Sequence, residues 1–305
     1  MVSLDRILCP VDLSDCSLHA LAHAAAIAAW YESRLAVMHV LVTAPVLGAP
    51  PSFGASTIPS TAVDEADRAA HLEALQQFIA RAVGDSPLET TLVDGPDPRH
   101  EILAQARAFD ANLLVMGTHG RTGVDHVLLG SVTEKVLRKA SCPVLVVPRD
   151  AGTTARPNEP PFKRILCPVD FSESSIRALA YAFDLAEEAD ARISLLHVVE
   201  VPRELSEFPF TGDLDLDRIR VRAESKYAGR LGDLVPPEAQ DYCSVAIQVS
   251  EGRAHREILR VAANGQSDLI VMGVQGRGAV DLALFGSNTH SVIRGSRCPV
   301  LTVPA

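Results

Sequence analysis

The sequence predicts an α/β protein built from two tandem, doubly wound domains. Two observations lead to this fold class. First, the 305-residue chain repeats itself, because Arg6–Asp12 recurs without a change as 164–170. Second, within each copy, short apolar segments typical of buried strands alternate with longer segments typical of helices. Strands joined by helices imply right-handed crossovers and a parallel sheet that helices cover on both faces.

The repeat also predicts the domain boundaries. Val115–Gly117 recurs as Val271–Gly273, and Cys142–Leu145 recurs as Cys298–Leu301, both at a shift of 156 residues. A period of this length indicates duplicated domains and not a solenoid. We expect a first domain at 1–149, a linker at 150–161 and a second domain at 162–305.

The first elements of each half follow from apolar content and periodicity. The short apolar run Ile7–Val11 predicts a buried strand, and the alanine-rich segment Ser17–Trp30 predicts a helix because alanine is the best helix former. Leu35–Leu41 is apolar and predicts the second strand. The stretch at 43–62 is rich in Pro, Gly and Ser and predicts a loop, whereas the amphipathic segment Asp64–Val83 predicts a helix.

The remaining elements complete the alternation of strands and helices. Glu89–Val93 alternates as a strand does, Arg99–Phe109 is helical in pattern, and Leu113–Met116 is a buried strand. Ser131–Ala140 predicts a helix and Val144–Val147 the last strand. The second half repeats this order.

Charge and cysteine content exclude several classes of function. The formal charge is -10, and the chain has no run of Lys and Arg that would neutralise phosphates, so nucleic acid is not an expected partner. No apolar run approaches the ~20 residues of a membrane span, and the first residues do not resemble a signal peptide. Four of the six cysteines lie in apolar runs and none forms a C-x-x-C pair, which indicates reduced thiols in a cytoplasmic protein.

A duplicated glycine pattern is the strongest candidate for a ligand site. Gly117, Gly120 and Arg121 follow a buried strand, and Gly130 and Ser131 come nine residues later at the start of a helix. Glycines let backbone amides approach an anion, and the N-terminus of a helix favours phosphate. The pattern is neither a Walker A loop nor a Rossmann fingerprint. The second copy has the same spacing in Gly273, Gly276, Arg277, Gly286 and Ser287.

Structural uses of the same residues remain alternatives. The glycines could serve turns alone. Ser131 with Glu134 is spaced as a capping box, but Ser287 lacks this partner because His290 stands at the equivalent position. Capping therefore explains the first copy better than the second, and the identical spacing of both copies favours a cradle for a polyphosphate.

Three motifs resemble the universal stress protein family. They are the G-x-x-G-x9-G-S pattern, the opening ILCPVD-x-S segment and the closing CPVLVVP segment, and the two copies cover nearly the whole chain. The chain is similar to a tandem universal stress protein. This resemblance implies an open five-stranded parallel sheet in each domain, of the adenine nucleotide alpha hydrolase-like kind. It also implies ATP binding, with or without Mg²⁺, for members that keep the glycines.

The resemblance assigns roles to individual residues. Asp12 would contact the ribose or the triphosphate, although it could instead cap the following helix together with Ser14. Val40 and Met116 would contact adenine, although each taken alone is a core residue. Arg121 could reach phosphate or remain a solvated loop residue. The expected binding residues are Pro10, Asp12, Val40, Met116, Gly117, Gly120, Arg121, Gly130, Ser131 and Val132, with Pro168, Asp170, Val198, Met272, Gly273, Gly276, Arg277, Gly286, Ser287 and Asn288 in the second half.

Residues near the motifs differ in what they predict. His39 and His197 lie in apolar strands and are expected to be hydrogen-bonded core histidines, not ligands. His119 becomes Gln275 in the second copy, and Val132 becomes Asn288, so the two sites are expected to differ in affinity.

The leading functional hypothesis is a cytoplasmic, ATP-binding regulatory or protective protein of the stress response. Its basis is the doubled cradle together with the lack of a recognisable catalytic set. The alternative is a slow ATPase or nucleotidyl-transferring enzyme that uses Asp12 and Asp170 with a divalent ion. A purely structural interaction module is a third reading, which the intact glycine spacing disfavours.

The last strand of each half predicts how the halves assemble. Val144–Val147 and Val300–Val303 follow Cys-Pro and are expected sheet edges, which invite pairing with another strand. Because both copies lie in one chain at high effective concentration, we expect them to pair as an intrachain pseudo-dimer. The sequence leaves self-association of whole chains open.

Overall fold

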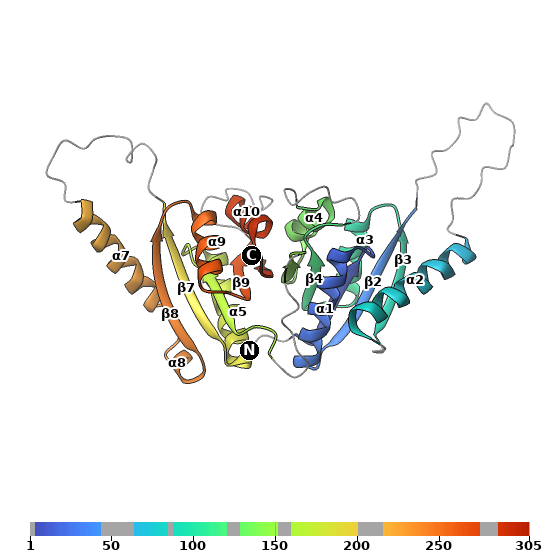
Figure 1. Ribbon diagram of the computed structural model, residues 1–305, viewed down its shortest axis with the longest axis horizontal. Helices are drawn as coiled ribbons and strands as arrows, with labels where there is room; N and C mark the ends of the chain where they lie inside the picture. The colour runs from blue at the N-terminus through green and yellow to red at the C-terminus, as the bar shows by residue number, and fades with distance from the viewer. Residues whose placement is uncertain are drawn as a thin grey trace, which may run out of the picture.

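A computed structural model describes residues 4–43, 64–84, 88–120, 129–149, 151, 160–200, 216–274 and 286–304. Its ten strands form one sheet in the order β3-β2-β1-β4-β5-β10-β9-β6-β7-β8. The first half of the chain supplies one side of this sheet and the second half the other (Figure 1). The predicted fold class is confirmed, since each half contributes five strands that are mutually parallel.

The elements alternate in both halves as the sequence predicts. The first half contains β1 (Arg6–Val11), α1 (Asp15–Trp30), β2 (Arg34–Val42), α2 (Glu65–Val83), β3 (Glu89–Gly95), α3 (Pro98–Ala108), β4 (Leu113–Gly117), α4 (Ser131–Lys139) and β5 (Val144–Val147). The second half contains β6 (Arg164–Pro168), α5 (Glu173–Ala189), β7 (Arg192–Val199), α7 (Leu216–Gly232), α8 (Ala239–Tyr242), β8 (Ser244–Glu251), α9 (Ala254–Asn264), β9 (Leu269–Gly273), α10 (Ser287–Gly295) and β10 (Val300–Val303). Only α8 has no counterpart among the described elements of the first half.

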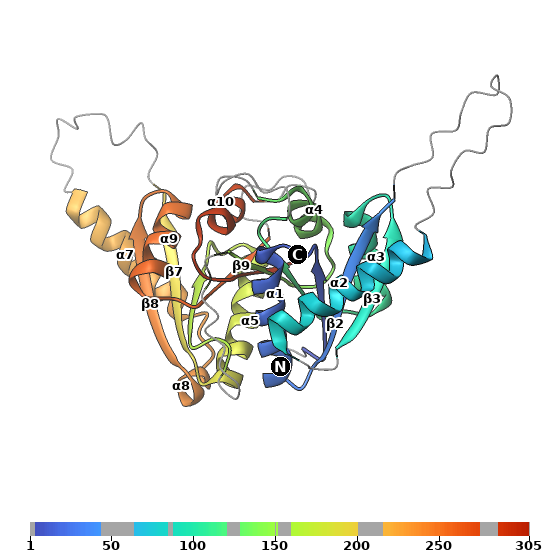
Figure 2. The ribbon, with the colours of Figure 1, turned by 45° about the vertical axis from the view of Figure 1, so that its right-hand side comes forward.

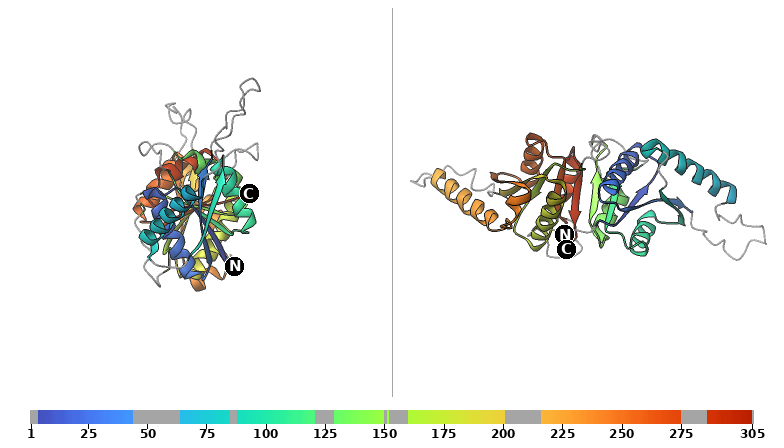
Figure 3. Two further views of the ribbon diagram at one scale, coloured as in Figure 1. Left: turned by 90° about the vertical axis from the view of Figure 1, so that its right-hand side faces the viewer. Right: turned by 90° about the horizontal axis from the view of Figure 1, so that it is seen from below.

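Helices cover both faces of the sheet (Figure 3). One hydrophobic cluster lies under α1, α2, α5 and α8, and a second lies under α3, α4, α9 and α10. Each cluster contains residues from both halves, among them Leu145 and Leu301 in the first cluster and Val146 and Val300 in the second. The two halves therefore share their core across the central strands.

The linker predicted at 150–161 lies largely outside the described residues. Of its described positions, Ala151 is 3% exposed and belongs to the first hydrophobic cluster. Phe162, the first residue of the expected second domain, is also buried in that cluster. At both ends of this connection, at Ala151 and Phe162, the chain is therefore buried in the shared core.

The predicted pairing of the last strands is present. β5 and β10 run antiparallel at the centre of the sheet, with Leu145 opposite Leu301 and Val146 opposite Val300 (Figure 3). The Thr302 hydroxyl donates a hydrogen bond to the carbonyl oxygen of Val144 at 3.1 Å, and Thr302 is fully buried. The halves form an intrachain pair through these strands.

Helices α4 and α10 lie side by side above this central pairing (Figure 1, Figure 2). Glu134 on α4 and His290 on α10 occupy equivalent positions of the repeat. Burial lowers the pKa of His290, while the nearby Glu134 carboxylate acts in the opposite direction. The two halves thus place different titratable groups, a carboxylate and an imidazole, at the same position of the shared boundary.

Five of the six thiols are buried, as the sequence predicts, whereas Cys298 is half-buried. Cys9 and Cys167 are fully buried in β1 and β6, and burial raises the pKa of both thiols far above its usual value. Burial also raises the pKa of Cys142, to about 11. No described helix is long and apolar enough to cross a membrane.

Burial predicts that Cys9 and Cys167 resist alkylation, since the thiolate is the reactive form. We expect iodoacetamide at pH 8 to leave both thiols unmodified in the folded chain and to modify both after unfolding in guanidinium. Peptide mass spectrometry of the two samples is the measurement. Modification of either thiol in protein that retains its native circular dichroism would contradict this assignment.

Candidate functional site

The candidate site lies where the order of the strands reverses. β1 pairs with β2 on one side and with β4 on the other, so the chain continues in opposite directions from this point. Ligands of open α/β sheets bind at such a switch point, outside the carboxyl ends of the strands. Asp12 follows β1 and Thr118 follows β4, so both lie at this end of the sheet.

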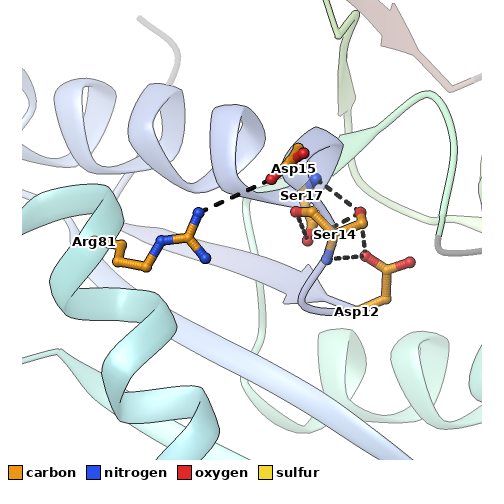
Figure 4. A network of polar contacts seen from close by, with 5 residues as sticks. All are labelled: Asp12, Ser14, Asp15, Ser17 and Arg81. Carbon is orange, nitrogen blue, oxygen red and sulfur yellow. Dashed lines mark hydrogen bonds and ion pairs between the residues drawn. The ribbon is translucent and has the colours of Figure 1, made fainter.

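Asp12 organises the start of α1. Its Oδ1 accepts hydrogen bonds from the backbone N–H of Ser14 at 3.1 Å and from the Ser14 hydroxyl at 2.6 Å (Figure 4). Ser14 in turn is the N-cap of α1, and its side chain accepts from the N–H of Ser17. Asp15 on the same turn pairs with Arg81 of α2 at 3.9 Å. The capping alternative is therefore correct for one oxygen of Asp12.

The second half repeats this network. Asp170 Oδ1 accepts from the Ser172 N–H at 2.9 Å and from the Ser172 hydroxyl at 2.5 Å. Ser172 caps α5 through the N–H of Ser175. The two aspartates therefore occupy equivalent settings.

Both aspartates are followed by a bulky residue in the left-handed region. Leu13 has φ 64° and Phe171 has φ 62°. Such a conformation costs ~1–3 kcal/mol for a residue with a Cβ, and it persists at functional sites when surrounding contacts enforce it. The sequence contains no local signal for it, since neither position is Gly, Asn or Asp.

Gly117 and Gly273 are needed for close approach of a helix. A Cβ on Gly117 would lie 2.8 Å from Cys16 Sγ, and a Cβ on Gly273 would lie 2.7 Å from the backbone carbon of Ser174. Cys16 and Ser174 lie in the first turns of α1 and α5. These glycines let the helix starts pack directly against the ends of β4 and β9.

The structure brings Gly120 directly against Asp12. A Cβ on Gly120 would lie 2.6 Å from Asp12 Oδ2, the oxygen that does not bond to Ser14. Gly120 does not have a positive φ, so a left-handed conformation is not what requires glycine here. Its role is to let the backbone lie close to the carboxylate.

The second glycine corner opens helix α4. Gly130 is the N-cap of α4 with φ -58°, and its N–H donates to the carbonyl oxygen of Thr118 at 2.8 Å. The N–H of Glu134 is bonded to Gly130 O at 2.9 Å, so the three preceding N–H groups are the usual unpaired donors of a helix start. Gly286 begins α10 in the same way, with its N–H bonded to Val274 O at 3.0 Å.

The capping box predicted for Ser131 and Glu134 is wrong. Ser131 is the first helical residue, not the N-cap, and Gly130 provides no side-chain cap. Glu134 instead pairs with Arg138 one turn later, at 2.8 Å. Capping therefore does not explain why serine stands at position 131.

His119 is a candidate that the glycine pattern did not identify. Its Nδ1 lies 3.0 Å from the Thr118 hydroxyl, and its buried Nε2 has no hydrogen-bond partner among the residues the structure describes. A Cβ on Gly130 would come within 3.5 Å of the His119 Cα, so this histidine lies between the two glycine corners. Its only sequence signal was its position between the glycines.

Apolar residues line the strand ends on the face of the sheet that α3, α4, α9 and α10 cover. Met116 and Met272 are 5% and 6% exposed, and Val40, Val132 and Val198 are half-buried against the same hydrophobic cluster. The buried Pro10 pairs with Met38 of β2, and Pro168 with Leu196 of β7.

His39 and His197 lie against helices α2 and α7. The ring of His39 lies 6.3 Å from that of His71, and the ring of His197 lies 4.4 Å from that of Tyr227. The Nδ1–H of His39 donates to the carbonyl oxygen of Val11 and that of His197 to the carbonyl oxygen of Val169, each at 2.7 Å. Both are therefore hydrogen-bonded core histidines, as predicted.

Several predicted residues lie outside the described part of the chain. They are Arg121, Gly276 and Arg277, together with most of the loop at 43–62. Ser287 and Asn288 are described and begin α10.

Comparison with known proteins identifies the family. A family model described as the universal stress protein family matches residues 3–148 and again residues 161–304. The chain belongs to the universal stress protein family. Because the model matches twice, this universal stress protein carries two copies of the family's domain, as the repeat predicts.

Individual relatives agree with this assignment. Universal stress protein Rv2623 of Mycobacterium tuberculosis is 30% identical over 221 residues, which cover 70% of this chain and 71% of that protein. Universal stress protein Rv2005c of the same organism is 31% identical over 198 residues, and the match spans 61% of the length of that relative. A universal stress protein structure from Archaeoglobus fulgidus covers 99% of this chain and 98% of its own, with a TM-score of 0.60 and 24% identity, and it supports the fold alone.

Proposed function

We propose that this universal stress protein binds ATP at the carboxyl end of each half-sheet and acts as a regulatory or protective protein in the cytoplasmic stress response. The observation that carries the proposal is the close approach of the Gly120 backbone to Asp12 Oδ2, which a Cβ at position 120 would prevent. A glycine segment held in this way beside the N-terminus of α4 suits a phosphate chain bound by backbone amides.

The chemistry of the surrounding groups fits a nucleotide. Asp12 Oδ2 would accept a hydrogen bond from a ribose hydroxyl. The unpaired Nε2 of His119 would donate a hydrogen bond to a phosphate oxygen, or would pair with a hydroxyl group. Val40 and Met116 would contact the adenine ring from the apolar side. We assign the same roles to Asp170, Val198 and Met272 in the second half.

The remaining assignments belong to the same proposal. Backbone amides at Gly117, Gly130, Ser131 and Val132, and at their equivalents in the second half, would hold the phosphates, with Arg121 and Arg277 as charged partners. Mg²⁺ would accompany the phosphates and not a dedicated protein cage, since Mg²⁺ usually keeps several waters. The domain division at 1–149 and 162–305, joined by a linker, is part of this proposal.

Equilibrium dialysis with labelled ATP tests the proposal on the full chain freed of prebound ligand. We expect saturable retention with up to two ATP molecules per chain and with different affinities, because His119 is replaced by Gln275 in the second copy. Labelled GTP is the control for base recognition. No retention of ATP at millimolar concentration would refute the proposal.

We expect no catalytic turnover beyond slow hydrolysis. In the enzyme alternative, Asp12 and Asp170 act with a divalent ion, and turnover would disappear in Asp12→Asn with Asp170→Asn while ATP binding persists. In our proposal, any phosphate release with Mg²⁺ is slow and does not change in this double variant. A steady-state rate that depends on both carboxylates would favour the enzyme.

A further inference from the structure

A cavity of about 410 Å³ lies in the first half, at the end of the sheet opposite to the candidate nucleotide site. Its lining comes from the last turns of α1 and α2 and from the first residues of β2 and β3, including Ala25, Ala28, Ser33, Leu35, Val83 and Leu88. These strands begin here, whereas Asp12 and Gly120 lie at their carboxyl ends. The volume falls within the ~300–1,000 Å³ typical of small-molecule pockets.

The repeat shows what normally fills this space. Ala25 corresponds to Phe183 in α5, at the repeat shift of 158 residues, and Phe183 is 4% exposed. The connection that follows α7 also carries the extra helix α8, which contacts α5 and β8. Ala239 of α8 is fully buried there. Figure 1 shows α8 at the lower end of the second half, away from α10.

The described residues of the first half provide neither of these fillings. Alanine replaces the aromatic ring, and α2 ends at Val83 only a few residues before β3 begins at Glu89. An apolar space is therefore left over the alanine face of α1. Cores are ordinarily packed without such voids, because each void loses dispersion contacts and costs stability.

The polar groups of the cavity favour an uncharged occupant. Arg34 and Glu89 pair with each other at 2.9 Å at the strand starts, so their charges compensate. The Ser33 hydroxyl is buried and has no hydrogen-bond partner among the described residues. The second half has Ala191 at the equivalent position, where it is 1% exposed.

We propose that this cavity is a second binding site, one that takes a small neutral aromatic molecule with a hydroxyl or N–H group. The aromatic ring takes the place that Phe183 occupies in the other half, and its polar group bonds to Ser33. Among the described residues of the second half, Phe183 and α8 take up the equivalent region, so we assign the site to the first half. It is independent of the proposed nucleotide site because it lies at the other end of the sheet.

The test uses phenol and toluene as probes of nearly equal shape, titrated into the full chain and followed by NMR. Phenol is expected to bind saturably at one site and more tightly than toluene. Ala25→Phe, which copies the second half, should lower the affinity for both probes at least ~10-fold. If Ala25→Phe does not fold, Ala25→Leu replaces it in the test. Its smaller side chain should also lower the affinity for both probes.

Ser33→Ala distinguishes the polar contact from simple apolar filling. It should weaken phenol binding several-fold and leave toluene binding unchanged. ATP retention should be unaltered in Ala25→Phe, which separates this site from the proposed nucleotide site. The inference is overturned if the wild-type chain shows no saturable phenol binding, or if both Ala25 variants bind the probes as the wild type does.

Discussion

Replacing Leu145 with alanine should lower the free energy of unfolding by ~2–5 kcal/mol, the range found for buried leucines. Leu145 is 1% exposed in β5 and lies opposite Leu301 of β10, which is 3% exposed. The substitution removes apolar contacts on both sides of the boundary between the two halves. Equilibrium unfolding in urea of the full chain is the measurement.

A double-mutant cycle shows whether the contact joins the two halves. Leu145→Ala and Leu301→Ala should not be additive, with a coupling of ~0.5–3 kcal/mol, because directly paired side chains share their contacts. Leu195→Ala is the matched control, since Leu195 is fully buried in β7, four strands away from β5. At ~4.8 Å per strand this is roughly 19 Å, so Leu145→Ala with Leu195→Ala should be additive. Additive effects in the first pair would contradict the central pairing.

Gly120→Val should weaken ATP binding by the first half at least ~10-fold, a loss of about 1.4 kcal/mol. The added Cβ would lie 2.6 Å from Asp12 Oδ2, so the carboxylate must move or the glycine segment must shift. Either change displaces the backbone segment that we propose to hold the phosphate chain. Equilibrium dialysis should then show one high-affinity site fewer per chain, with far-UV circular dichroism unchanged.

Gly229→Val is the matched control for Gly120→Val. Gly229 lies in α7, and a Cβ there would meet no atom within 4 Å. We expect this variant to bind ATP as the wild type does. The companion change Gly276→Val should remove the second site, and the double variant of both cradle glycines should retain no ATP. Unchanged affinity in that double variant would mean that the nucleotide binds elsewhere.

The local sequence was a good guide to the elements. Strand and helix periodicities are properties of neighbouring residues, so β5 (Val144–Val147) was predicted with its observed bounds, and most other elements shifted by only a few residues. Their ends moved where caps decide them. Asp64, predicted as the first residue of a helix, is the N-cap of α2.

The sequence was a weaker guide to why individual residues are needed. Its pattern identified Gly117 and Gly120 but indicated only turns or the approach of backbone amides to an anion. In the structure Gly117 admits the start of α1, and Gly120 admits the carboxylate of Asp12. His119 gained significance only when its unpaired nitrogen was found between the two glycine corners.

The linear sequence was enough to predict that this universal stress protein is a duplicated α/β chain whose two halves meet through their last strands. Repetition, periodicity and the position of apolar edge segments are all visible along the chain. The difference between the two halves became visible only in the folded chain. The first half has Ala25 and an open cavity where the second has Phe183 and α8. Filling such a space depends on side chains from elements distant in the sequence, and no periodicity within one segment reports whether those side chains meet.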